Sequence, residues 1–186
     1  GDGDNLAYLL KYDSVYRTYE KDVKFGAGEL TVGNKKVRMI QEKEPTKLPW
    51  GDMKIDIVVE STGVFESFES SEAHIKAGAK RVVITAPAKA GERDDAKTVL
   101  LGVNEDEFKT CKITSNGSCT TNAAHPLGAI LGANPGIKKA VLATVHGYTA
   151  SQNLVDGPTR GRDYRRGRAA AANISPSFTG AAISVT

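Results

Sequence analysis

The sequence is poor in residues that mark several specialised protein classes. Its two cysteines are too few for a disulfide scaffold in 186 residues, and neither has the Cys-x-x-Cys spacing of a metal site. No apolar run approaches the ~20 residues of a membrane span. The acidic Gly-Asp-Gly-Asp start differs from the basic and then apolar start of a signal peptide, and there is no initial Met. We therefore expect an intracellular protein without membrane contact, and a piece of a longer chain.

An excess of charge of one sign is also nearly absent. The 25 basic and 22 acidic residues leave a net charge of +3, which is too small to indicate nucleic-acid or membrane binding by itself. The basic excess is local, because five arginines fall within 160–168. What remains is an ordinary soluble composition, 40% hydrophobic and 25% charged. It excludes disordered and collagen-like classes and suits one domain or parts of two.

The first two thirds of the chain predict a helix, a hairpin and then a parallel sheet. Apolar residues at 6, 7, 9 and 10 form a helical turn, and Gly33-Asn34 is a hairpin turn between strands at 29–32 and 36–40. Further on, strand patterns at 55–59 and 81–85 flank a helical pattern at 66–76, and 99–101 and 112–114 are shorter strand candidates. The β-branched run at 55–59 is of the kind found in a sheet covered on both faces. Strand, helix and strand in this order predict a parallel α/β sheet.

Three of these strands end in small and mostly polar residues. The sequences are Ser61-Thr62-Gly63, Thr85-Ala86-Pro87 and Ser115-Asn116-Gly117. Ligands of open parallel sheets bind outside the carboxyl ends of the strands, which makes these residues candidates for a binding site. The alternative is that they are ordinary turn residues. No Gly-x-Gly-x-x-Gly fingerprint is present, so the phosphate-binding turn of a dinucleotide domain would have to precede Gly1.

A second helical pattern begins at Cys119. At the N-terminus of a helix, the dipole and the free backbone N–H groups stabilise a thiolate. Residues 140–145 then have strand character and end at His146. A helix of about 14 residues advances ~21 Å and a strand of about seven returns ~23 Å. This path brings His146 beside Cys119, where an imidazole can activate a thiol nucleophile; a histidine satisfied in the core is the alternative.

Several motifs along the chain resemble those of one enzyme family. They are Ser115-Asn-Gly-Ser-Cys-Thr-Thr-Asn122, Thr144-Val-His-Gly-Tyr-Thr149, Val155-Asp-Gly-Pro158, Thr179-Gly-Ala-Ala182, Leu9-Leu-Lys-Tyr-Asp-Ser14, Trp50-Gly51 and Glu60-Ser-Thr-Gly-Val-Phe65. In content and order they resemble the phosphorylating glyceraldehyde-3-phosphate dehydrogenases. The segment around Cys119 is the most specific part of this resemblance.

The resemblance implies a role for each matching residue. Cys119 matches the nucleophile that attacks the aldehyde carbon, and His146 matches the base that activates the thiol. Positions that hold the substrate's phosphate or the attacking inorganic phosphate are matched by Ser118, Thr120, Thr149, Thr179 and Gly180. The implied cofactor is NAD, with Lys43, Thr62, Gly63 and Thr85 on the cofactor side and no metal. Gly157-Pro158 resembles the form of the family that prefers NAD.

The resemblance also implies how the chain is organised. Residues 1–118 would form a partial NAD-binding domain with a Rossmann-type parallel sheet, and 119–186 would begin an α+β catalytic domain. The family's glycine-rich loop and most of its catalytic domain have no counterpart in the sequence. We expect the intact parent to be a cytoplasmic homotetramer that acts in glycolysis on glyceraldehyde 3-phosphate and inorganic phosphate.

Two other functions stay open at this point. The related erythrose-4-phosphate dehydrogenase would use the same nucleophile with a different sugar pocket, although Thr149 and Thr179-Gly180 favour the triose phosphate enzyme. A non-catalytic fragment would instead bind RNA or another partner through the arginines of 160–168, with Tyr164 stacking on a base. The alternative for those arginines is a loop at a subunit interface.

Overall fold

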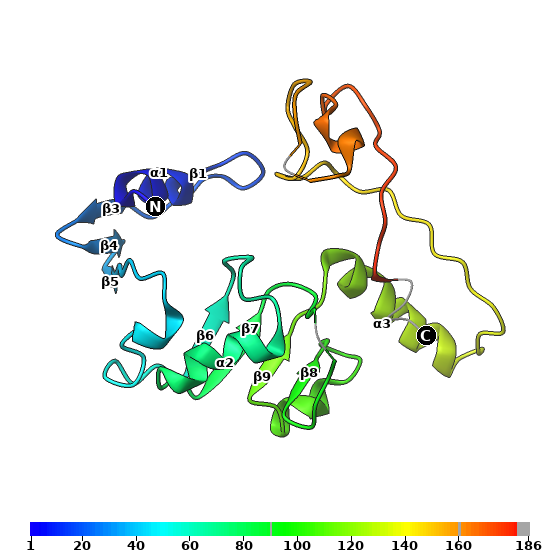
Figure 1. Ribbon diagram of the computed structural model, residues 1–186, viewed down its shortest axis with the longest axis horizontal. Coiled ribbons are helices and arrows are strands. Elements are labelled where there is room, and N and C mark those ends of the chain that lie inside the picture. Colours follow the sequence, from blue (N-terminus) through cyan, green and yellow to red (C-terminus); the bar gives the residue numbers. More distant parts are fainter. Residues whose placement is uncertain (90, 160, 182–186) are drawn as a thin grey trace.

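The computed structural model describes residues 1–89, 91–159 and 161–181, so Arg160 of the arginine run and Ala182 of the last motif lie outside the described residues. Figure 1 shows an open arrangement in which a small N-terminal unit, a central sheet and a long C-terminal segment follow one another. The elements outside the helices and sheets are short 3-10 turns. These are η1 (Pro45–Lys47), η2 (Glu105–Lys109) and η3 (Tyr164–Gly167).

The N-terminal unit is a helix beside two small antiparallel sheets. Its elements are α1 (Gly3–Lys11), β1 (Tyr12–Asp13), β2 (Arg17–Thr18), β3 (Val23–Gly26), β4 (Glu29–Val32) and β5 (Lys35–Arg38). Asp2 caps α1 by accepting from the Asp4 backbone N–H. Strands β4 and β5 form the predicted hairpin, with Gly33 at a φ of 59° in the turn. The predicted helix and hairpin are confirmed, whereas β3 was not predicted.

The central unit is a four-stranded sheet in which all strands run parallel, in the order β6-β7-β9-β8. Its strands are β6 (Ile57–Glu60), β7 (Arg81–Ile84), β8 (Ala96–Thr98) and β9 (Ile113–Ser115). Helix α2 (Phe68–Lys76) is the crossover between β6 and β7. The Ser67 side chain caps the start of this helix by accepting from the Ser70 backbone N–H. Gly78, with a φ of 104°, ends the helix. The predicted parallel α/β sheet is therefore confirmed.

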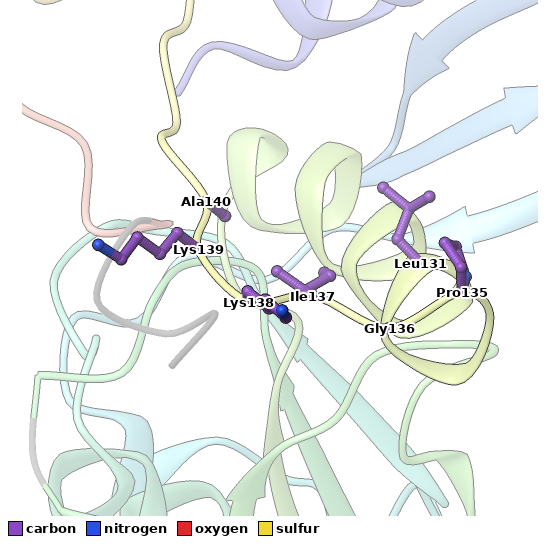
Figure 2. A pocket seen from close by; sticks show the side chains of 7 residues that line it. All are labelled: Leu131, Pro135, Gly136, Ile137, Lys138, Lys139 and Ala140. Atoms are coloured by element: carbon purple, nitrogen blue, oxygen red, sulfur yellow. The ribbon is translucent and has the colours of Figure 1, made fainter.

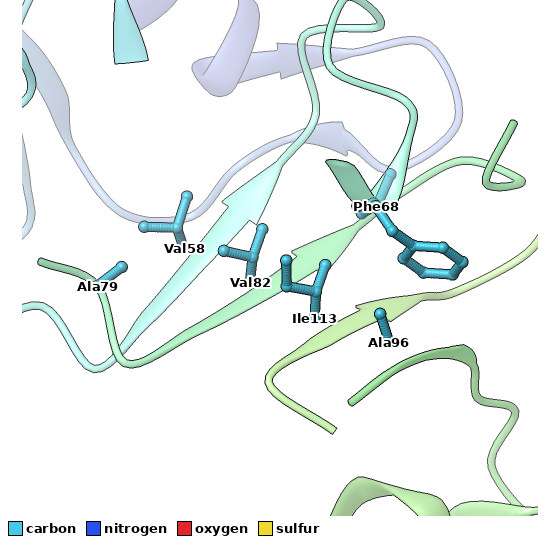
Figure 3. Close-up of a cluster of buried hydrophobic side chains, with 7 residues drawn as sticks. Val58, Phe68, Ala79, Val82, Ala96 and Ile113 are labelled. Atoms are coloured by element: carbon cyan, nitrogen blue, oxygen red, sulfur yellow. The ribbon is translucent and has the colours of Figure 1, made fainter. Parts of the chain in front are cut away.

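One face of this sheet carries the hydrophobic core. Val58, Val82 and Ile113 stand side by side on three neighbouring strands (Figure 3), and they form one buried cluster with Phe68 of α2. The opposite face is open at β6, where Ile57 and Val59 are 56% and 59% exposed. The prediction of a sheet covered on both faces is therefore wrong for this strand.

The strand predicted at 99–101 is also wrong. The strand that pairs with β9 lies earlier, at β8, and Val99 adds only one more bond, from its backbone N–H to the Ser115 carbonyl. The Asn104 side chain then accepts from the Leu100 N–H and donates to the Thr98 carbonyl. These bonds turn the chain away from the sheet before residues 100 and 101 can extend the strand.

Helix α3 (Cys119–Ala133) follows the sheet and begins at the predicted residue. The strand predicted at 140–145 is wrong, because these residues form no regular element and Val141 and Val145 are 96% and 100% exposed. A strand needs a neighbour for its backbone bonds, and the described part of 119–181 contains no strand. The segment folds on itself by turns instead, for example through Gly157 N–H to the Gly167 carbonyl at 2.9 Å.

Candidate functional site

The turn between β9 and α3 places Cys119 at the carboxyl edge of the sheet. Ser115 donates its hydroxyl to the Ala86 carbonyl and accepts from the Gly117 N–H, which joins the turn to the loop after β7. Gly117 has a φ of 64°, and a Cβ there would lie 3.0 Å from Thr121. A side chain at 117 would therefore meet both a strained backbone and a close neighbour.

Ser118 starts the helix that carries Cys119. Its side chain accepts from the Thr121 backbone N–H at 2.9 Å and also contacts the Thr121 hydroxyl at 2.8 Å. The Asn122 amide donates to the carbonyls of Asn116 and Ser118 and so ties the first turn back to the preceding loop. The polar residues around Cys119 thus orient the nucleophile candidate as well as cap the helix.

The structure brings Cys119 and His146 together. The Cys119 Sγ lies 3.0 Å from the His146 Nε2, although 27 positions separate them in sequence. On the other side of the ring, His146 Nδ1 lies 2.6 Å from the Gly147 carbonyl oxygen, which can only accept. Nδ1 therefore carries the proton, and in the neutral ring Nε2 is left free to accept the proton of the thiol.

The electrostatics of the pair favour its ionised form. The hydrogen bond with His146 is the main cause that lowers the pKa of the Cys119 thiol, and contacts with Thr120 add to it. The bond to the Gly147 carbonyl raises the pKa of His146, and the contact with Cys119 raises it further. Both side chains are exposed, so a small electrophile can reach the sulfur. The arrangement is that of an activated, accessible thiol.

The predicted phosphate-binding residues fall into two groups. Ser118 and Thr120 lie beside Cys119, and the Thr120 hydroxyl is 3.9 Å from its Sγ. Thr149 lies three positions after His146 and shares a hydrogen bond with the Ser151 hydroxyl, while the Thr179 hydroxyl accepts from the Ala181 N–H. Gly180 is exposed next to it. The hydroxyls of Thr149 and Thr179 thus bond within their own turns.

The predicted cofactor-side residues lie where β6 and β7 end, with one exception. Thr62 and Thr85 both bond to Glu60, the last residue of β6, and Gly63 has a φ of 71° in the loop that follows. These loops are exposed and offer hydroxyls at the edge where open parallel sheets bind ligands. Lys43, by contrast, lies in the exposed loop before η1.

Sequence reasoning missed the residues beneath these loops. Glu60 and His74 are buried and 2.9 Å apart, and Trp50 donates to His74. The available signal was a carboxylate at the end of an apolar strand, directly before the Ser-Thr-Gly sequence. A charged residue in that position is buried only when it is hydrogen-bonded.

A hollow at the other end of α3 takes no part in this site. It is lined by Leu131 and residues 135–140, where the chain turns after the helix (Figure 2).

No helix in the part of the chain that the structure describes is long and apolar enough to cross a membrane. Within the same residues, no group of three His, Cys, Asp or Glu side chains is placed to hold a metal ion.

Comparison with known proteins identifies the family. Residues 1–68 match the family model "Glyceraldehyde 3-phosphate dehydrogenase, NAD binding domain". Residues 118–186 match the model "Glyceraldehyde 3-phosphate dehydrogenase, C-terminal domain". The chain belongs to the glyceraldehyde-3-phosphate dehydrogenase family. The predicted resemblance is therefore confirmed, and both halves of the Cys119–His146 pair lie in the part that matches the second model.

Individual glyceraldehyde-3-phosphate dehydrogenases are similar along nearly the whole chain. Glyceraldehyde-3-phosphate dehydrogenase 1 of Kluyveromyces marxianus is 47% identical over 182 residues, which are 98% of this chain and 54% of the relative. The cytosolic enzyme of Trypanosoma brucei brucei is 47% identical over 184 residues, 99% of this chain and 54% of the relative. The Chlamydia muridarum enzyme is 47% identical over 185 residues, with shares of 98% and 54%. The chain thus spans about half the length of these curated relatives.

Proposed function

We propose that the intact protein oxidises glyceraldehyde 3-phosphate with NAD and inorganic phosphate to 1,3-bisphosphoglycerate, in glycolysis. The observation that carries the proposal is the 3.0 Å contact between Cys119 Sγ and His146 Nε2, at the end of the sheet where a cofactor would bind. Family membership supports both the reaction and the cofactor.

The chemistry begins at the sulfur of Cys119. His146 takes the thiol proton on Nε2, and the thiolate attacks the aldehyde carbon to form a C–S bond. His146 then returns that proton to the oxyanion, which gives a thiohemiacetal and leaves the imidazole neutral. His146 then accepts the proton of that hydroxyl group while a hydride leaves the same carbon, and a thioester remains on the sulfur. Bound NAD supplies the hydride acceptor. Proton and hydride together account for the two electrons removed from the aldehyde.

Inorganic phosphate completes the reaction at the thioester. A phosphate oxygen attacks the acyl carbon, the C–S bond breaks, and Cys119 leaves as the thiolate that His146 stabilises when protonated. We assign Ser118, Thr120, Thr149, Thr179 and Gly180 to the two phosphate groups of this step. Ser118 and Thr120 are supported by their place on either side of Cys119 in the sequence, and the Thr120 hydroxyl lies 3.9 Å from the sulfur.

We assign the NAD side to Thr62, Gly63, Thr85 and Lys43. The first three are supported by their place at the carboxyl ends of neighbouring parallel strands. The boundary between the partial NAD-binding domain and the start of the catalytic domain is proposed between 118 and 119, where α3 begins. We further propose that the intact protein is a cytoplasmic homotetramer.

The two rival functions receive less support. Three of the arginines proposed to bind RNA are paired with acidic residues of their own segment, because Arg165 and Arg166 bond to Asp163 and Arg168 bonds to Asp156. Such pairing reduces the positive charge offered to a phosphate backbone. No observation in the structure favours erythrose 4-phosphate as the substrate.

The proposal is tested by trapping the acyl enzyme. The full-length protein is mixed with glyceraldehyde 3-phosphate and NAD without phosphate, and intact-mass and peptide analysis then locates the thioester. We expect one acyl group on Cys119, released by added phosphate, and none on a Cys119→Ser variant. The matched control, Cys111→Ala, should be acylated like the wild type. A label that survives Cys119→Ser would contradict the proposal, and faster turnover of erythrose 4-phosphate would favour the rival enzyme.

A further inference from the structure

A chain of polar side chains lies beneath the proposed cofactor loops and takes no part in the cysteine chemistry. The Trp50 indole N–H lies 3.1 Å from His74 Nδ1, and His74 Nε2 lies 2.9 Å from Glu60 Oε2. An indole N–H can only donate, so Nδ1 of His74 accepts. The neutral ring then carries its proton on Nε2, and this N–H donates a hydrogen bond to Glu60. Trp50 therefore sets the donor and acceptor roles of both ring nitrogens.

Glu60 connects this chain to both cofactor loops. Its second carboxylate oxygen accepts from the Thr62 backbone N–H at 2.7 Å and from the Thr62 hydroxyl. Its backbone carbonyl accepts from the N–H and the hydroxyl of Thr85, at 3.0 and 3.1 Å. One residue at the end of β6 thus holds the loop that follows its own strand and the loop that follows β7.

The carboxylate of Glu60 is buried and charged. The side chains of Glu60 and His74 are 3% and 5% exposed. Burial by itself raises the pKa of a carboxyl, but the hydrogen bonds from Thr62 and His74 outweigh it and leave the pKa of Glu60 below its ordinary value. A buried charge of this kind is stable only while its partners stay in place, so it restrains the residues that bond to it.

The Trp50 end of this series of hydrogen bonds is fixed by a close backbone contact. The Gly51 N–H donates to the Ala77 carbonyl at 3.0 Å, and the Cβ of any residue at 78 would collide with Gly51. This contact holds Trp50 against the end of α2, where it also packs on the hydrophobic core. This series of hydrogen bonds therefore begins at a closely packed part of the molecule and ends at an exposed loop.

We propose that Glu60 is a positioning residue for the cofactor, and that Trp50 and His74 orient its carboxylate so that Thr62 and Gly63 keep the loop shape that binds NAD. The proposal rests on the NAD-dependent function proposed above. Glu60 does not touch the reacting atoms in this account, because it acts through the backbone and hydroxyl of Thr62.

Two substitutions of His74 in the full-length protein separate positioning from packing. His74→Leu fills the space but donates nothing, whereas His74→Gln has a side-chain N–H that can replace the Nε2 donor. We expect His74→Leu to raise the Kd for NAD roughly tenfold, the size expected when a hydrogen bond to a charged group is lost. His74→Gln should restore binding, and Ile75→Val on the same helix should leave it unchanged.

The pH profile of Cys119 alkylation without NAD provides a second readout. It should be the same in His74→Leu and in the wild type, because His74 acts on the cofactor loop and not on Cys119. Equal NAD affinity of folded His74→Leu and wild type would overturn the proposal, as would equal weakening by Leu and Gln. A wild-type protein that binds no NAD would instead overturn the proposed function.

Amide hydrogen exchange tests the loop restraint without any substitution or cofactor. The Thr62 N–H should exchange slowly although its residue is exposed, because it bonds to a buried carboxylate. Fast exchange at Thr62 would overturn the proposal even if His74→Leu does not fold.

Discussion

The two sides of the proposed site are built in different ways. On the cofactor side, Thr62 and Thr85 are held by Glu60 at the end of a parallel strand, above a core that includes Val82 and Ile113. On the base side, His146 lies in a segment without regular structure, and the side chain of its neighbour Val145 is fully exposed. The first is positioned by packing and the second by a few hydrogen bonds. The thiol chemistry therefore depends on one contact, between Cys119 of α3 and His146 of the segment without regular structure.

Removing His146 should have the largest effect, because it breaks the link between the two regions. In the full-length protein, His146→Ala should lower kcat/KM by about 10²–10⁴-fold, the usual contribution of a general base. His125→Ala is the matched control, because that ring bonds to the Thr121 carbonyl on α3. Steady-state kinetics on both variants measure the difference. Similar losses in both would contradict the role given to His146.

The difference in packing should appear as a difference in stability. Ile113→Ala removes a buried core side chain and should lower the free energy of unfolding by about 3 kcal/mol. Val141→Ala changes a side chain that is 96% exposed, and its effect should stay within about 0.5 kcal/mol. Denaturant unfolding of the two variants tests the comparison. A loss at Val141 as large as that at Ile113 would mean that the C-terminal segment has a packed core of its own.

A smaller loss of stability than at Ile113 is expected at the helix cap between the regions. Ser118→Ala removes the acceptor for the Thr121 N–H and should destabilise the protein by about 1 kcal/mol. Ser118→Asp keeps an acceptor and should recover most of that loss. Thermal unfolding of both variants measures it. A stable Ser118→Ala protein would show that α3 is held mainly by other contacts.

Sequence patterns predicted the regular parts of this fold better than the irregular ones. The strands at 57–60 and 81–84 and helix α2 follow from β-branched runs, helical spacing and a stop glycine. The strand expected at 140–145 has the same kind of composition but no neighbouring strand among the described residues, and local composition cannot reveal a missing partner. The strand predicted at 99–101 failed for another tertiary reason, because the Asn104 side chain takes the Leu100 N–H and ends the pairing there.

The site was predictable where its chemistry is local. A cysteine at a helix N-terminus can be identified from the sequence, and the approach of His146 was predicted although the strand meant to carry it does not form. The chain from Trp50 through His74 to Glu60 was not predictable, because it joins three separate elements through tertiary packing. Hydrogen bonds of this kind leave no periodic pattern in a sequence.

The pH dependence of Cys119 alkylation tests the central claim most directly. Cys111 serves as an internal control, because it is buried and should react only when the protein unfolds. The lowered pKa of Cys119 predicts that alkylation begins at a pH below the ~8.5 of a free thiol, and that His146→Ala moves the midpoint back up. A midpoint near that of a free thiol, unchanged in His146→Ala, would contradict the account of Cys119 and His146 as one catalytic pair.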